Sequence, residues 1–416
     1  MIDYSKNKIN KINTILSLIL GISFFLLNLG ISIFYILSFF FLIYYSFKNT
    51  INIDFLQKIF LSFLVYLFCA NFFKNPSEIN LDFFFENLLL FKFFLLFLFL
   101  DVLIKDIKYI KKIITINFFI LIFLIFEVYL QRIIGFDLFG YSIHPYNRVT
   151  GPYNEELVIG TLILYIGFHS FFYFLMDKKF NSKINEFIFF VLFFNVYFFS
   201  IYLTGERMNF LMSLLIIFMM FVFLQKHRKK ILFSFLIFIS LIYSTFHFNF
   251  HVSKKYETLL QIVNLDISKM ITENSQKSSN YKAKKDKSNL NVYEDAEDIK
   301  KNNSLEIHLS HFIVGIEIWK DYKIFGSGVK SFRKICGDYN NFKLFLKDKS
   351  CSTHPHNYLV ELLVETGLFG IAFFAVFIFL IFKKNSQSLL FFLKKPENNL
   401  FIISFLIISI SLIWPL

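Results

Sequence analysis

Long apolar runs, each close to the length of a membrane-crossing helix, follow one another along most of this 416-residue chain. A hydrocarbon core of about 30 Å requires roughly 20 apolar residues in a helix. Hydrophobic residues make up 56% of the chain and 64 residues are phenylalanine, which favours the same class. The sequence therefore predicts an all-α polytopic membrane protein. We predict eleven spans, at residues 12–28, 30–47, 56–73, 83–104, 113–134, 155–176, 185–203, 208–225, 231–248, 357–382 and 397–415.

Lysine and arginine residues lie mainly in alternate loops between the predicted spans. If the amino terminus is cytoplasmic, twenty of these cations fall on the cytoplasmic side. The short loops on the other side hold four: Lys74, Arg132, Arg148 and Arg207. Because positively charged loops remain in the cytoplasm, we predict a cytoplasmic amino terminus and an outer last residue. The net charge of +13 sets this topology, and we expect no binding of nucleic acid.

Residues 249–354 form one large outer loop in this topology. Residues 272–304 are polar and charged and hold few large apolar side chains, so a mobile segment is predicted. In residues 305–336 apolar side chains return at helical spacing, and we predict that the helix ends near Gly326 and Gly328. The predicted organisation is spans one to nine in residues 1–248, the loop in 249–354, and spans ten and eleven in 355–416.

Two of the three cysteines, Cys336 and Cys351, fall in this outer loop, on the side where disulfides persist. A bridge between them would stabilise the folded state by about 3 kcal/mol, because it restricts the unfolded chain. It would also anchor the segment that leads to His354. We predict the disulfide, and the alternative is two free thiols.

A pair of histidines, His354 and His356, lies where the polar loop gives way to an apolar run. Pro355 is predicted to open the following helix, since proline suits the first helical position. The positive end of a helix dipole disfavours imidazolium, so His356 is expected to be neutral and able to accept a proton. Free N–H groups at such a helix end can also bind a phosphate. The alternative for His356 is a simple helix cap, and His354 is expected to support the site rather than act as the base.

Two outer arginines, Arg148 in a long loop and Arg207 in the short turn TGERMNF, are predicted to face the same side of the membrane as His356. Guanidinium groups bind phosphate in a bidentate manner and stay charged, which suits a diphosphate. Arg207 could instead anchor the turn to lipid headgroups. Arg148 could pair with Glu155 or Glu156 and only shape its loop. The shared face favours a phosphate-binding corner.

Three polar residues at intervals of four, Asn357, Glu361 and Glu365, share one face of the tenth predicted span. Carboxylates inside an apolar helix are costly unless they are paired or face water. A structural ion pair or hydrogen bonding within the bundle is the favoured interpretation, and an acid–base pair is the alternative. The chain has no CxxC pair, HExxH motif or P-loop lysine, so no metal, ATP or other cofactor is expected.

The motif HPHNYLVELLVETGLFG resembles a segment of the O-antigen ligase and polymerase family of bacterial envelope glycosyltransferases. It carries that family's pattern of His-Asn, Glu and Gly-x-x-Gly at the start of a late span. RVTGPYNEELVIGTL, the arginine turn TGERMNFL and the tryptophan segment IWKDYKIFGSGVKSF resemble three further segments of the family. The resemblance covers most of residues 120 to 416.

The resemblance implies a metal-independent glycosyltransferase with eleven membrane helices, or twelve in the full family pattern, and one large periplasmic loop. Such an enzyme lies in the bacterial inner membrane and moves a glycan from undecaprenyl diphosphate to an acceptor sugar at the periplasmic face. Arg148 and Arg207 match the arginines that hold the lipid diphosphate, and His356 matches the catalytic base. A single displacement that inverts the anomeric centre is the simplest reaction. Supporting residues are expected at His354, Asn357, Glu361, Glu156 and Glu206.

The chain departs from the family pattern in two places. Relatives often carry an arginine on the helix ahead of the tryptophan, whereas around Trp319 this chain has only His308, His311 and, later, Lys330 and Arg333. The chain also ends at IWPL, where relatives continue through an outer loop and a last span.

Three other functions compete with a ligase. A polymerase would use the same site, with a growing lipid-linked glycan as acceptor in place of the lipid A-core. A lipid-linked glycan flippase or a transporter would carry charges at mid-membrane and internal repeats, whereas here the charges cluster at one face and no repeat is seen. A purely structural envelope protein leaves the HPHN motif unexplained.

Overall fold

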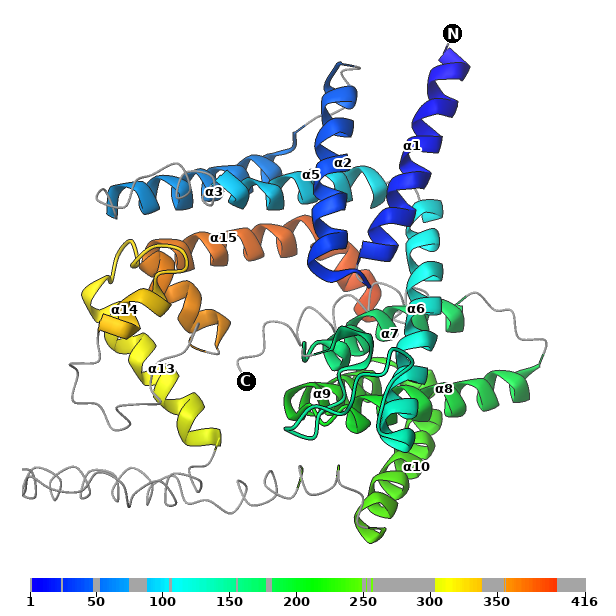
Figure 1. The fold of residues 1–416 in the computed structure, drawn as a ribbon. Coiled ribbons are helices and arrows are strands. Elements are labelled where there is room, and N and C mark those ends of the chain that lie inside the picture. The colour runs from blue at the N-terminus through cyan, green and yellow to red at the C-terminus, as the bar shows by residue number, and fades with distance from the viewer. Residues whose placement is uncertain are drawn as a thin grey trace, which may run out of the picture. The chain divides into compact units, whose positions relative to one another are not determined.

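The computed structural model describes most of the chain, and its regular secondary structure is helical within the described residues (Figure 1). Two isolated bridges, Phe136 with Ser142 and His144 with Arg148, lie in one loop. The described residues are 2–23, 25–47, 53–74, 88–104, 107–154, 156–176, 182–248, 304–338 and 357–394, with Val252, Tyr256 and Pro355.

The chain divides into two compact units. The first unit holds Met1–Gln57, Phe91–Glu257 and Phe382–Trp414, and the second holds Lys58–Leu90, Thr258–Ile381 and Pro415–Leu416. The helices of the first unit are α1 (Ile2–Ser23), α2 (Leu27–Phe47), α5 (Lys92–Ile104), α6 (Ile107–Ile134), α7 (Ile159–Met176), α8 (Lys183–Leu203), α9 (Arg207–Phe223) and α10 (Arg228–His247). Short 3-10 helices occur at η2 (Leu89–Phe91), η3 (Gly151–Tyr153) and η4 (Gln225–His227).

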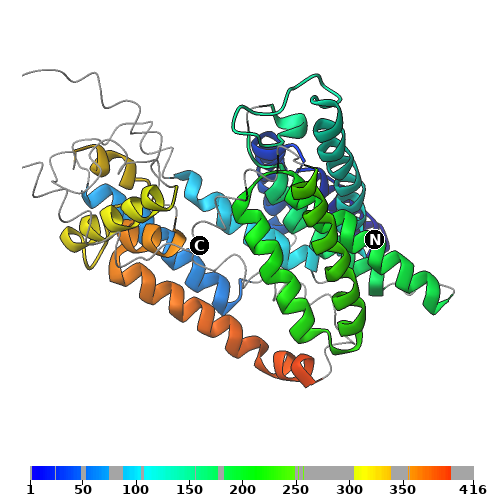
Figure 2. The same ribbon diagram turned by 90° about the horizontal axis from the view of Figure 1, so that it is seen from below.

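Helix α6 is the centre of the first unit, where it packs against α1, α5, α7 and α8 (Figures 1 and 2). Apolar side chains fill these contacts, because Leu121, Leu124 and Val128 of α6 are fully buried. Polar side chains also connect α6 to α1 near the start of α6, where the Tyr109 hydroxyl donates to Asn10 Oδ1 at 3.0 Å. Helix α6 therefore holds its carboxyl-terminal end, and the loop that follows, in a fixed place within this unit.

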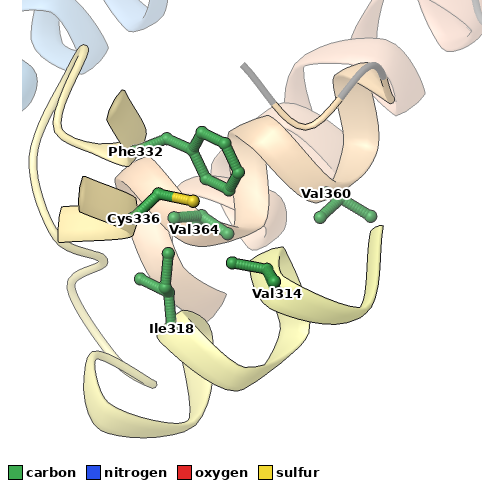
Figure 3. Packing of buried hydrophobic residues seen from close by; sticks show 6 residues of the cluster. All are labelled: Val314, Ile318, Phe332, Cys336, Val360 and Val364. Atoms are coloured by element: carbon green, nitrogen blue, oxygen red, sulfur yellow. The ribbon is translucent and has the colours of Figure 1, made fainter. Parts of the chain in front are cut away.

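The second unit consists of α13 (Ser304–Asp321), α14 (Phe332–Asp338), most of α3 (Phe55–Lys74) and most of α15 (Tyr358–Lys394). Side chains from α13, α14 and the first turns of α15 form one apolar cluster (Figure 3). The members of the cluster are Val314, Ile318, Phe332, Cys336, Val360 and Val364. Aromatic contacts such as Tyr66 with Phe369 and Phe63 with Phe373 pack α3 along α15.

Helix α15 is interrupted at Gly367, whose φ of 66° and ψ of −167° are not helical. The segment from Lys323 to Gly328 occupies the interruption with its backbone. Ser327 N donates to Val364 O at 2.7 Å and Gly328 N to Glu365 O at 2.9 Å, while Leu368 N donates to Lys323 O at 2.9 Å. The tryptophan segment and the Gly-x-x-Gly segment, separated in sequence, are thus joined through their main chains.

Helices lie at the first ten of the predicted span positions. The eleventh position, residues 397–415, falls outside the described residues, as does the predicted mobile segment 272–304 except for Ser304, which begins α13. In the part of the chain that the structure describes, four helical segments are long and apolar enough to cross a membrane: Lys108–Ile134, Lys183–Leu203, Gln225–His247 and Tyr358–Ile381. Shorter apolar helices occur at Ser32–Ile43, Phe55–Ala70, Leu89–Leu98, Ile159–Phe171 and Arg207–Phe223. The number of spans and the periplasmic position of the large loop therefore stay predictions.

Two local predictions are wrong. Helix α13 ends at Asp321, short of Gly326, because the residues that follow bond to α15 instead of continuing the helix. Pro355 does not open the last helix, since α15 begins at Tyr358. The predicted span 357–382 agrees with the candidate span Tyr358–Ile381, although α15 is interrupted at Gly367 and extends to Lys394.

Candidate functional site

The loop that carries Arg148 is fastened to the end of α6 by one buried amide, that of Gln131. Its Oε1 accepts hydrogen bonds from Thr150 N at 3.1 Å and from Gly151 N at 3.0 Å, and its Nε2 donates to Tyr141 O at 3.0 Å. Both arms of the loop are therefore tied to the same side chain. One turn earlier, Glu127 Oε2 accepts a hydrogen bond from Leu138 N at 3.2 Å.

The next residue of α6, Arg132, connects this loop to the end of α8. Its Nε donates to Leu203 O at 2.5 Å, its Nη1 to Asn147 Oδ1 at 2.7 Å and its Nη2 to Asn147 O at 3.1 Å. Asn147 adopts a left-handed conformation, with a φ of 53°, which asparagine tolerates better than most residues. The residue directly before Arg148 is therefore held by a guanidinium.

The short turn between α8 and α9 lies directly against the Arg148 loop. Val149 N donates to Thr204 O at 2.9 Å, so the residue after Arg148 is fixed as well. Gly205 has a φ of 76°, and a Cβ at this position would lie 2.7 Å from Asn147 O and 3.7 Å from the Cα of Arg148. Glycine is needed here for both its backbone conformation and the close approach of the two segments.

Arg148 and Arg207, 59 positions apart in the sequence, are brought close by this contact. Burial lowers the pKa of Arg207, the charge of Arg148 lowers it further, and Tyr256 acts in the opposite direction. The Nε atom of Arg148 is buried and has no hydrogen-bond partner among the described residues. Two cations that repel one another, one with an unused donor, form a site that favours an anion.

The two glutamates predicted to support the arginines have different surroundings. Glu206 is buried, its Oε1 accepts a hydrogen bond from Gly160 N at 3.2 Å, and its Oε2 accepts one from Asn209 Nδ2. Glu206 therefore joins the first turn of α7 to that of α9. Glu156 is exposed and forms no salt bridge with Arg148, and Glu155 lies outside the described residues.

Tyr256 was not anticipated from the sequence, yet it packs beside the arginines. Its hydroxyl donates to Tyr202 O at 2.9 Å, and its ring stacks on that of Tyr202 with centroids 4.7 Å apart. Burial raises the pKa of Tyr256, while Arg132 and Arg207 act in the opposite direction. Tyr256 therefore covers the carboxyl-terminal end of α8, next to the turn that presents Arg207.

In the second unit, Asn357 is the amino-terminal cap of α15. Its Oδ1 accepts hydrogen bonds from Leu359 N at 3.1 Å and Val360 N at 3.0 Å. Glu361 lies in the first turn, and Glu365 Oε1 accepts a hydrogen bond from Lys330 N at 2.8 Å. The side chain of Glu365 is thus used to hold the tryptophan segment, in agreement with the structural interpretation.

The predicted base His356, its neighbour His354 and Cys351 lie outside the described residues. Cys336 is fully buried in the apolar cluster (Figure 3). It is also disulfide-bonded. Its predicted pairing with Cys351 stays a prediction. Of the residues around Trp319 that could replace the family arginine, His311 is buried, whereas Lys330 and Arg333 are exposed.

Sequence reasoning overlooked Gln131 and Arg132, which position the Arg148 loop. The sequence does contain a signal, since Glu127, Gln131 and Arg132 follow the long apolar run in the middle of α6. Polar side chains at such a place need partners, and the following loop is the nearest source of them.

Comparison with known families gives one match. Residues 188–375, just under half of the chain, match the family model described as O-antigen ligase. The matched region contains the Arg207 turn, Trp319 and the start of α15, and Arg148 precedes it. A search of curated proteins finds no match to the chain.

Proposed function

Residues 188–375 of this chain match the family model described as O-antigen ligase, and from this match we propose that the protein is a membrane glycosyltransferase of the ligase type. It moves a glycan from undecaprenyl diphosphate to a sugar hydroxyl of the lipid A-core. The reaction takes place at the periplasmic face of the bacterial inner membrane, with the amino terminus in the cytoplasm. The Lys and Arg distribution supports this orientation.

The observation that carries this proposal is the convergence of Arg148 and Arg207. Val149 and Thr204 hydrogen-bond at 2.9 Å, so two loops that are distant in sequence present their arginines together. A diphosphate placed between them receives bidentate hydrogen bonds and removes the repulsion between the two cations. The same contacts strengthen as negative charge develops on the leaving diphosphate, which lowers the barrier to its departure.

We assign the role of general base to His356. Its imidazole takes the proton of the acceptor hydroxyl while the oxygen attacks the anomeric carbon and the bond from that carbon to the diphosphate oxygen breaks. The products are the glycosylated acceptor and undecaprenyl diphosphate, and the anomeric centre is inverted. General base catalysis of this kind contributes typically 10²- to 10⁴-fold in rate. Support comes from the residue type and from its position directly before the cap Asn357 of α15.

The test is glycan transfer by the purified protein in lipid nanodiscs, with a lipid diphosphate donor and either a lipid A-core acceptor or a lipid-linked glycan acceptor. We expect product on lipid A-core, and His356→Ala should abolish it while His247→Ala, at an exposed position, should not. Product only on the lipid-linked glycan would identify a polymerase. Full turnover by His356→Ala with either acceptor would show that another residue is the base.

A further inference from the structure

We propose that Arg132 is the positioning residue that sets the spacing between Arg148 and Arg207, and so lets the site select a diphosphate over a monophosphate. This inference rests on the proposed function, because the donor diphosphate is the group that the two arginines hold. The observation behind it is that one guanidinium binds both segments that carry these arginines.

The three hydrogen bonds of Arg132 reach in two directions. Nε donates to Leu203 O at the end of α8, four residues before Arg207, while Nη1 and Nη2 both donate to Asn147, the neighbour of Arg148. A guanidinium is planar and its donors diverge at fixed angles. The distance between the Asn147 backbone and the α8 terminus is therefore set by a rigid group.

A guanidinium is energetically unfavourable if its role is only to connect the Asn147 segment to the end of α8. Arg132 is partly buried and its three hydrogen bonds go to neutral oxygens, so among these contacts no carboxylate offsets the cost of burying its charge. A neutral side chain could satisfy one carbonyl without this cost. The arrangement is explained if both segments must be held at one separation, and if the bound ligand is anionic and offsets the added charge.

Two neighbouring contacts complete the connection without replacing it. The bond from Val149 N to Thr204 O joins the loop to the turn beyond Arg148, and Tyr256 covers the α8 end by donating to Tyr202 O. Neither of these contacts reaches Asn147. In the absence of Arg132 the loop would keep its bonds to Gln131, the bond from Val149 to Thr204 and its internal bond from His144 N to Arg148 O. It would lose the guanidinium that joins Asn147 to the end of α8, so the spacing between Arg148 and Arg207 would be less tightly set.

A fixed spacing matters for a ligand with two phosphates more than for one with a single phosphate. A diphosphate can contact both arginines at once only if their separation matches it, whereas a monophosphate needs only one of them. Displacement by about 1 Å can cost on the order of 100-fold where geometry is demanding. Loosening Arg148 should therefore weaken diphosphate binding and leave monophosphate binding nearly unchanged.

The experiment measures the dissociation constants of undecaprenyl diphosphate and undecaprenyl monophosphate for the protein in nanodiscs. We expect the wild type to prefer the diphosphate, and Arg132→Lys to lower that preference by roughly 10-fold or more. Lysine keeps the positive charge but lacks the planar, diverging N–H donors of the guanidinium. The lysine variant therefore distinguishes an effect of geometry from an effect of charge. Asn147→Ala, which removes one of the three bonds, should give a smaller loss. The unfolding temperature of each variant shows that the protein is folded.

Arg228→Lys is the matched control, since Arg228 also forks onto two helix-terminal carbonyls, those of Phe221 and Val222, at the junction of α9 and α10. It should leave the diphosphate preference unchanged. If Arg132→Lys keeps the wild-type preference, Arg132 does not set the spacing. A further outcome is that Arg132→Ala abolishes the preference for the diphosphate while Arg132→Lys retains it. In that case the positive charge is what matters and the planar guanidinium geometry does not, and the inference is wrong. A wild type without any preference would instead refute the proposed diphosphate site itself.

Discussion

Ser327 donates its backbone N–H to the carbonyl oxygen of Val364 at 2.7 Å, within the helix that Gly367 interrupts. The Ser327 hydroxyl reaches the same carbonyl at 3.0 Å. Together with the bonds from Gly328 to Glu365 and from Leu368 to Lys323, this contact fills the gap in the α15 hydrogen-bond ladder. The Gly-x-x-Gly motif is thus a docking point for the tryptophan segment.

Gly367→Ala tests this docking. The left-handed φ of 66° costs a residue with a Cβ about 1–2 kcal/mol, and the added Cβ would also overlap with Ile324 O. We expect a lower unfolding temperature and faster proteolysis after Lys323 or Lys330. Gly140→Ala is the control, because its φ is 85° but no atom lies within 4 Å of the added Cβ. Equal effects of the two substitutions would show that backbone strain alone matters and that docking does not.

Gln131→Ala should destabilise the first unit by at least about 2 kcal/mol, because it leaves two buried N–H groups, those of Thr150 and Gly151, without their partner. The measurement is thermal unfolding in detergent with and without the substitution. Gln225→Ala, at an exposed glutamine, should change stability by less than about 0.5 kcal/mol. A Gln131→Ala protein as stable as the wild type would mean that the Arg148 loop does not depend on this amide.

Arg148→Gln should raise the unfolding temperature at low ionic strength, because it removes a charge that repels Arg207. The gain should shrink as salt is added, since screening weakens the repulsion between the wild-type arginines. The same variant should lose the stabilisation that inorganic pyrophosphate gives the wild type. Arg333→Gln, at an exposed arginine in the other unit, should show neither effect. A fall in the low-salt unfolding temperature of Arg148→Gln would argue against repulsion.

Asn357→Ala should lower the free energy of unfolding by about 1 kcal/mol, which is the typical effect of removing a helix cap. Asn357→Ser restores an oxygen that can accept from the backbone of the first turn, so it should recover most of the stability. If the cap positions His356, transfer activity should recover with the serine variant too. Activity that is lost in both variants while stability recovers would indicate a direct role of the amide in the reaction.

Hydropathy predicted the helices well because each apolar run must be helical in a membrane, whatever it packs against. The ends of α8, α9 and α10 lie within a few residues of the positions expected from sequence, and α6 ends at the expected residue but begins earlier, at Ile107. The ends of α13 and the interruption of α15 were not predictable in this way. They depend on main-chain bonds between residues 323–328 and 364–369, and such bonds carry no side-chain signal beyond the glycines.

The arginines were recognised from sequence because their charge and their predicted side of the membrane are both local properties. The residues that hold them were not, since Gln131 and Arg132 owe their importance to partners at Thr150, Asn147 and Leu203. Asn357 could have been identified, because asparagine is a preferred cap and precedes an apolar run. The sequence prediction instead placed the start of this helix at Pro355, two positions earlier.

The interruption of α15 also has a consequence for the order in which the parts of this unit form. A peptide group without a partner in hydrocarbon costs several kcal/mol, so neither half of this helix is complete until residues 323–328 supply theirs. Those residues leave the ribosome before α15 does. We therefore expect residues 323–328 to be available when the predicted span in α15 enters the bilayer, because they are synthesised first.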